Sequence, residues 1–300
     1  MSRRLQMLQV ARLARRTLGE AADLVAAFLA SLEAAGGGYR DRGGRPDLYY
    51  TSFAIDALQA LDALPDDGPR AAANRRYLDA FGAGRGLDFV HRCCLARAWA
   101  AQPAGTVPEP VRDGLVAGLA DHRAGDGGYH ARAGAARGSV YGCFLAVNAH
   151  ADLRQPLAPA AADAIAACIA ALATPDGGWS NTPDQPDGST TATAAAIATL
   201  ASLERPVPAA AGDWLLARMH PAGGFTAAAD APIPDLLSTA VALHALDSLD
   251  TPWRDHRERV LDFLDTLWTA EGAFHGSWAD DEPDAEYTFY GLVALGHCSV

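Results

Sequence analysis

A short turn of small residues that ends in an aromatic residue recurs along this chain at a nearly constant spacing. The clear copies are Gly37-Gly38-Tyr39, Gly127-Gly128-Tyr129, Gly177-Gly178-Trp179, Gly223-Gly224-Phe225 and Gly272-Ala273-Phe274, and a weaker copy stands at residues 81–84. Successive copies are about 45 to 50 residues apart, a spacing typical of units that stack into a solenoid or close into a ring. The repeat therefore predicts one of these two architectures.

The copy at residues 221–246 shows the unit most clearly. Its turn is followed by a loop, by Asp235 and Thr239, and then by an apolar run over residues 240–246. Aspartate is a good N-cap, and a segment that is apolar on nearly every side forms a helix buried all round. The same step recurs at residues 47–51, 187–191 and 284–288, and degenerate copies begin at Gly138 and Asp88.

A second, more amphipathic segment precedes most of the turns, at residues 21–34, 111–123, 158–173, 209–219 and 253–269. Each repeat then consists of an outer helix, a glycine turn and an inner apolar helix. Six such hairpins bury their inner helices against each other only by closing into a ring. We therefore predict an all-α fold: an α/α toroid (α6–α6 barrel) of six helical hairpins, with parallel inner helices around a central cavity and a single domain over residues 1–300. Residues 3–34 are expected to form an amphipathic surface helix, with a helix lying on an anionic membrane as the alternative.

Composition excludes several classes of function. Half of the residues are hydrophobic, which is enough for a large core. The net charge is −12 and no stretch forms a sustained basic patch, so no nucleic-acid partner is expected. No apolar run reaches the length of a transmembrane segment. The five cysteines are odd in number and lack disulfide spacing, which favours reduced thiols and a cytoplasmic location.

Parallel inner helices place their N-termini and the long loops at one mouth of the barrel. Helix N-termini carry positive potential and free N–H donors, which suit an anion such as a diphosphate. Asp235 lies at this mouth, either in the binding site or as a plain N-cap. Aromatic residues near the rim suit a hydrophobic ligand or a carbocation, with simple packing as the alternative for each ring. The repeat register selects Tyr50, Tyr141, Trp179, Trp278, Tyr287 and Tyr290.

The turn, the Asp-x-x-x-Thr step and the inner helix resemble the repeats of protein prenyltransferase β-subunits and of squalene- or terpene-cyclase barrels, over essentially the whole chain. This resemblance implies a hydrophobic isoprenoid substrate and, for the prenyltransferases, a helical partner subunit and a zinc site. The zinc positions correspond here to Asp235, Leu237 and Tyr287. Leucine binds no metal and tyrosine is a poor zinc ligand, so zinc is not expected.

A different set, Asp88, His91 and Cys94, resembles part of the prenyltransferase zinc step but stands in another repeat. A capped helix with buried thiols is the plain interpretation of these residues. Magnesium is the other candidate ion if the substrate is a diphosphate, and the acidic residues at 280–282 are the place where it would bind. The alternative for this segment is a solvated acidic loop.

The cyclase side of the resemblance points to residues 284–288. Class II cyclases carry an Asp-x-Asp-Asp-Thr step whose middle carboxylic acid protonates an alkene. Here the step is Asp284-Ala-Glu286-Tyr287-Thr288, which keeps the spacing of the first two carboxylates. The resemblance therefore implies Glu286 as the catalytic acid with Asp284 as its partner, and such an acid needs a raised pKa.

Three functions follow as hypotheses. The first is an isoprenoid-binding enzyme that acts on a prenyl diphosphate or related substrate, by proton-initiated cyclisation. The second is a non-catalytic isoprenoid-binding subunit that pairs with another protein. The third is a metal-dependent prenyltransferase.

Overall fold

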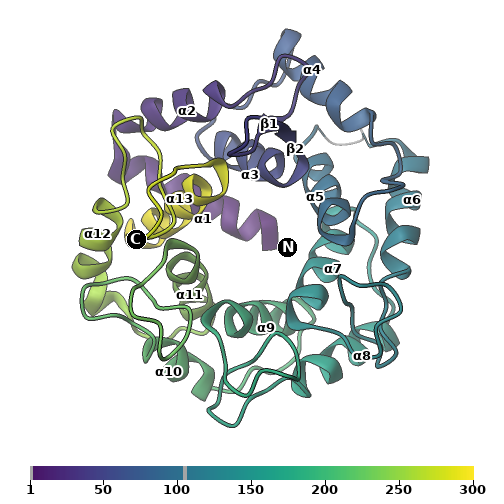
Figure 1. Cartoon of the computed structure of the whole chain (residues 1–300), viewed down its shortest axis with the longest axis vertical. Coiled ribbons are helices and arrows are strands. Elements are labelled where there is room, and N and C mark those ends of the chain that lie inside the picture. Colours follow the sequence, from purple (N-terminus) through teal and green to yellow (C-terminus); the bar gives the residue numbers. More distant parts are fainter. Residues whose placement is uncertain (1–2, 104–106) are drawn as a thin grey trace.

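The computed structural model describes residues 3–103 and 107–300, and in this part of the chain the helices form two concentric rings (Figure 1). The inner ring consists of α3 (Leu48–Ala60), α5 (Phe89–Ala100), α7 (Val140–Asp152), α9 (Thr190–Ser202), α11 (Leu236–Ser248) and α13 (Ala285–Cys298). The outer ring consists of α2 (Ala21–Ser31), α4 (Gly68–Asp79), α6 (Glu109–Ala120), α8 (Pro159–Ala170), α10 (Ala210–Leu216) and α12 (Arg257–Asp265). The remaining elements are α1 (Arg3–Leu18), a 3₁₀ turn η1 (Arg254–His256) and the short strands β1 (Tyr39–Arg40) and β2 (Pro46–Asp47).

The inner ring is closed. Each inner helix packs against the next one along the chain, and the last, α13, packs against the first, α3. The outer and inner helices alternate in sequence, so each pair is one hairpin. This arrangement confirms the predicted α/α toroid.

The recurrent turn and the recurrent threonine are tied together by one hydrogen bond. In four repeats the threonine hydroxyl accepts the backbone N–H of the turn aromatic, as in Phe225 N to Thr239 Oγ1 at 2.9 Å. The equivalent pairs are Tyr39 with Thr51, Trp179 with Thr193 and Phe274 with Thr288. In the degenerate repeat the Sγ of Cys143 takes the place of the hydroxyl beside Tyr129. The motif therefore anchors the turn to the first turn of the inner helix in five of the six repeats.

The inner helices begin at side-chain caps. Asp47, Asp88, Asp235 and Asp284 each accept a hydrogen bond from a backbone N–H in the first helical turn. Two repeats use serine, Ser139 and Ser189. In the fourth repeat the cap and the threonine are Ser189 and Thr193, two residues later than the step predicted at 187–191. Serine caps a helix as well as aspartate does, so the local structure is unchanged.

Glycine in the turn is required by both conformation and space. Gly223 has a φ of 86°, where side chains with a Cβ are strained. A Cβ at this position would also lie 1.8 Å from the carbonyl oxygen of Arg259 on α12. Glycine therefore lets the turn between α10 and α11 approach the next outer helix, α12, closely.

The N-terminal segment forms two helices instead of the predicted continuous one. The chain turns at Gly19, whose φ is 54°, and this separates α1 from the outer helix α2. Helix α1 runs from the centre of the ring, where the N-terminus lies, to one side of it (Figure 1), and contacts α13, α3 and α7. It lies at the C-terminal ends of the inner helices, because Arg15 donates to the carbonyl of Leu61 just after α3, and Thr17 contacts Ser299 just after α13. Helix α1 therefore covers the end of the barrel opposite the loops.

The five cysteines are free and buried. None of the helices in the described residues has the length and apolar character needed to cross a membrane.

Candidate functional site

The cavity wall follows a simple register counted from the helix caps. The residue two positions after each cap lines one of two neighbouring cavities in all six inner helices: Tyr49, Val90, Tyr141, Thr191, Leu237 and Glu286. The same face continues six and nine positions after the cap, as a helix of 3.6 residues per turn requires. On α11, for example, Leu237 is followed into the cavity by Val241 and His244.

The larger cavity has a volume of about 370 Å³ and the smaller about 90 Å³. They share six wall residues: Arg3, Met7, Tyr49, Tyr141, Phe144 and Tyr290. The wall of the larger cavity is mostly apolar, with small alanine side chains along α9 and a few polar groups from other helices. A cavity of this size and character suits a small hydrophobic ligand.

Glu286 places a carboxyl group in this wall. Its Oε1 accepts a hydrogen bond from the phenol of Tyr49 at 2.5 Å. Burial raises the pKa of Glu286 from 4.5 to about 7; the hydrogen bond from Tyr49 opposes this shift and the charge of Asp284 adds to it. A substantial fraction of Glu286 is therefore protonated near neutral pH, as a general acid requires.

Asp284 lies two positions before Glu286 in sequence but has a different role in the local structure. Its Oδ1 accepts the backbone N–H of Tyr287 and its Oδ2 accepts Arg42 Nε, both at 2.8 Å. Arg42 also donates to Asp280 at 2.9 and 3.1 Å. Arg42 comes from the loop of the first repeat and joins it to the last, and no motif in the sequence marks it. Burial raises the pKa of Asp284 against the hydrogen bonds from Tyr287 and Arg42.

Buried arginines stand at the α1 end of the cavities. Arg3 is 7% exposed and lines both of them. Arg4 and Arg97 both donate to Asp56, at 2.7 and 2.6 Å, so one buried carboxylate lies between two guanidinium groups. Burial lowers the pKa of Arg3 to about 9, so it is still cationic at neutral pH. The cavity thus has an acidic group near the loops and cationic groups near α1.

The aromatic residues selected from the sequence are spread over several environments. Tyr141 and Tyr290 line both cavities beside Glu286. Tyr50 and Tyr287 are three positions after their caps, one beyond the wall register; Tyr50 contacts the edge of Tyr49, and Tyr287 packs under Arg42.

The other selected residues lie away from the two cavities. Trp179 is buried in the helical core and donates to the carbonyl of Ile169. Trp278 is 43% exposed and donates to Thr266. Asp235 caps α11 through the backbone N–H of Ser238.

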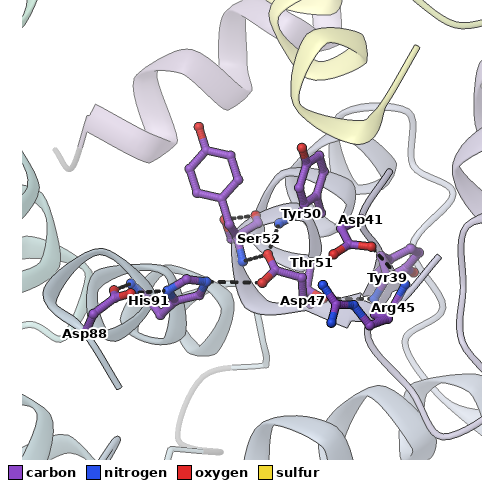
Figure 2. A network of polar contacts seen from close by, with 10 residues as sticks. Tyr39, Asp41, Arg45, Asp47, Tyr50, Thr51, Ser52, Asp88 and His91 are labelled. Atoms are coloured by element: carbon purple, nitrogen blue, oxygen red, sulfur yellow. Dashed lines mark hydrogen bonds and ion pairs between the residues drawn. The ribbon is translucent and has the colours of Figure 1, made fainter. Parts of the chain in front are cut away.

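His91 lies between two carboxylates rather than beside a thiol (Figure 2). Its Nδ1 is 2.9 Å from Asp88 Oδ2 and its Nε2 is 3.1 Å from Asp47 Oδ2. Burial opposes the charged ring, yet these two hydrogen bonds raise the pKa of His91. The Cys94 thiol lies in the wall of the smaller cavity, where burial raises its pKa to about 12. Both ring nitrogens of His91 are thus occupied, one by the N-cap of its own helix α5 and the other by the N-cap of α3.

The donor sets fit neither of the metals that the resemblance suggested. Within the described residues, no group of three or more His, Cys, Asp or Glu side chains is placed to hold a metal ion. At the zinc positions, Leu237 presents a hydrocarbon side chain. In the acidic loop, Arg42 already occupies the carboxylates of Asp280 and Asp284. The reaction proposed below therefore uses no metal ion.

Comparison with known proteins gives a family and a fold. The prenyltransferase alpha-alpha toroid domain matches in sequence at residues 130–212 and 207–299, more than half of the chain. No curated protein matches this chain in sequence.

Two similar solved structures are variants of the type II terpene cyclase MstE from Scytonema. One holds its substrate, geranylgeranyl dihydroxybenzoate: it is 14% identical, with a TM-score of 0.60 over 96% of this chain and 97% of that one. The other holds its product, merosterolic acid A: it is 15% identical, with a TM-score of 0.61 over 95% and 97%. A third, the Candida albicans protein geranylgeranyltransferase-I complexed with GGPP, is 14% identical, with a TM-score of 0.52 over 96% and 83%. At this identity the likeness establishes the fold.

Proposed function

The chain belongs to the family of prenyltransferase alpha-alpha toroid domains, and from this premise we propose that it is an enzyme that binds a prenyl chain in its central cavity and cyclises it by protonation. Glu286 is the acid. The aromatic rings of Tyr49, Tyr141 and Tyr290 stabilise the cation that forms beside them. One similar structure holds its substrate, geranylgeranyl dihydroxybenzoate, and another is a geranylgeranyltransferase complexed with GGPP, so a geranylgeranyl chain is the first probe to try.

The observation that carries this proposal is the carboxyl of Glu286 in an apolar wall, with a pKa raised to about 7. Ordinary carboxyl groups are ionised at neutral pH and cannot donate a proton. Tyr49 holds Oε1 of Glu286, which fixes the direction of the carboxyl group. Asp284 is a positioning residue. It caps α13 and so fixes where the helix begins, which places Glu286 in the first turn.

The reaction conserves atoms and electrons. The π electrons of an alkene take the proton of Glu286 and form a C–H bond, which leaves a carboxylate and a tertiary carbocation. A second alkene then donates its π electrons to the cation, forming a C–C bond and moving the charge along the chain. Loss of a proton ends the sequence, so the product is an isomer of the substrate.

Incubation with geranylgeranyl diphosphate, farnesyl diphosphate and the two corresponding alcohols tests the proposal. We expect at least one of these probes to give a cyclic isomer, and Glu286→Gln to lower that rate by about 100-fold or more. Glu282→Gln, an exposed carboxyl in the preceding loop, is the matched control and should leave the rate unchanged. Undiminished product formation by Glu286→Gln would exclude this acid.

A second candidate is a non-catalytic isoprenoid-binding subunit that pairs with a helical partner. It is favoured by the side chains Leu237 and Tyr287 at the zinc positions of a fold that resembles protein geranylgeranyltransferase-I. Light scattering on complexes purified with the full chain separates the two functions. A stoichiometric hetero-complex without turnover of any probe supports the subunit, whereas an active single species supports the enzyme.

A further inference from the structure

A chain of three polar side chains runs through the α1 end of the barrel, away from Glu286. His244 Nδ1 is 3.0 Å from His297 Nε2, and His297 Nδ1 is 2.6 Å from Asp247 Oδ2. Asp247 also accepts Trp253 Nε1 at 2.7 Å and Arg254 at 3.0 Å through its other oxygen. His244 and His297 are 6% and 2% exposed, whereas the side chain of Asp247 is 20% exposed. The chain therefore leads from the interior toward solvent.

The hydrogen bonds fix which ring nitrogens carry protons. A carboxylate only accepts, so His297 must donate its Nδ1–H to Asp247. Burial lowers the pKa of His297, and the ring is neutral, so its Nε2 is an acceptor. His244 then donates its Nδ1–H to that nitrogen. The remaining nitrogen, His244 Nε2, carries a lone pair.

This lone pair belongs to a side chain in the wall of the larger cavity. His244 continues the stripe of Leu237 and Val241 on α11. Its Nε2 is buried and has no hydrogen-bond partner among the described residues. Because an unpaired buried acceptor is costly, its retention in the wall indicates a ligand group that it meets there.

We propose that His244 Nε2 takes the proton whose loss ends the reaction, an inference that rests on the proposed cyclisation. The C–H bond next to the last carbocation breaks, its electrons form the C=C bond of the product, and the proton goes to His244. His297 and Asp247 are positioning residues that hold the accepting tautomer. His297, which contacts His244, stands eleven positions after Glu286 on α13, or about 16 Å along the helix axis. Proton donor and proton acceptor therefore stand at opposite ends of one cavity.

The charges around His244 favour its return to the neutral form. Burial lowers the pKa of His244 well below its usual value, and the nearby Arg3 and His297 lower it further. A carbocation is a far stronger acid than an imidazolium ion, so the neutral imidazole still takes its proton readily. The imidazolium formed is acidic and loses the Nε2 proton to solvent, which restores the neutral, accepting tautomer. His244, His297 and Asp247 also line a separate depression of about 380 Å³ beside α1, distinct from the two cavities described above. It gives the proton a route to solvent.

Two variants of His244 separate proton transfer from simple hydrogen bonding. Glutamine keeps an acceptor oxygen but takes no proton, and phenylalanine keeps a ring but loses both properties. With geranylgeranyl diphosphate as the probe, we expect His244→Gln and His244→Phe to consume substrate while the wild-type alkene forms about 100-fold more slowly and other alkene isomers or alcohols accumulate. The matched control is His150→Gln, which changes a histidine outside the two cavities.

The outcomes distinguish this inference from the proposed function. If both His244 variants consume substrate and give an unchanged product, the inference alone is overturned. It is also overturned if His244→Gln, but not His244→Phe, gives the wild-type product, because His244 then contributes only a hydrogen bond. Failure of the wild type to convert any prenyl probe overturns both proposals. Independently of turnover, ¹⁵N NMR of the full chain, with the His244 signals assigned from His244→Gln, should show a protonated Nδ1 and a bare Nε2. A proton on Nε2 overturns the inference whatever the activity.

Discussion

Replacing Glu286 by glutamine should stabilise the protein in alkaline solution and change little in acid. The folded-state pKa of Glu286 is raised from 4.5 to about 7, chiefly by burial. For a carboxyl group with a raised pKa, stability is greatest below the unfolded pKa and is lost as pH rises through the folded pKa. The full loss is about 3 kcal/mol, and about 2.5 kcal/mol of it falls between about pH 5 and about pH 8.5. Glutamine never ionises and avoids this loss.

The assay is thermal unfolding of wild type and Glu286→Gln at these two pH values. The advantage of the variant should grow by about 4 °C from the acidic to the alkaline condition. Glu282→Gln, the exposed control, should show no such growth. The reasoning is refuted if the difference between Glu286→Gln and wild type is the same at both pH values.

Tyr49→Phe provides a second perturbation of the same carboxyl group. The phenol of Tyr49 donates to Glu286 and so favours the carboxylate form. Its removal should raise the pKa of Glu286 further and move the pH at which stability falls to a higher value. A midpoint that moves down, or not at all, would contradict the assigned hydrogen bond.

Three further predictions concern the frame of the barrel. Asp56→Ala leaves the guanidinium groups of Arg4 and Arg97 without their carboxylate and should cost about 3–5 kcal/mol in chemical denaturation, whereas Asp113→Ala, at a 60% exposed side chain, should cost less than about 1 kcal/mol. Gly223→Ala should be more destabilising than Gly44→Ala by at least about 2 kcal/mol, because both have positive φ but only the first would collide with a backbone carbonyl; equal losses would contradict this. Thr239→Val should cost about 1–3 kcal/mol by leaving the N–H of the turn aromatic without an acceptor, and a neutral result would show that the motif is not anchored in this way.

The sequence carried enough information to predict the hairpins and the ring, because each repeat contains its own turn, cap and threonine. The positions of the caps also predict which side chains line the cavity. Tyr141 and Tyr290 stand two and six positions after their caps and line the cavity, whereas Tyr50 and Tyr287 are three positions after theirs. Counting two, six and nine residues from every cap would have selected Tyr49 and His244 as well.

Contacts between distant parts of the chain could not be predicted in this way. Arg42 and Asp284 are 242 residues apart, and only closure of the ring brings them together. Helix α1 stands outside the repeat, so the pattern gave no place for the arginines that it carries into the cavity. The relay of His244, His297 and Asp247 likewise needs two helices, α11 and α13, that become neighbours only in the folded ring.

Conversion of geranylgeranyl diphosphate in D₂O tests the central claim most directly. If Glu286 protonates an alkene, the product is an isomer of the substrate that retains the diphosphate and carries one deuteron from solvent, and Glu286→Gln makes almost none of it. Mass spectrometry of the product reads both properties at once. Release of the diphosphate without uptake of deuterium, or equal product from Glu286→Gln, would contradict the account.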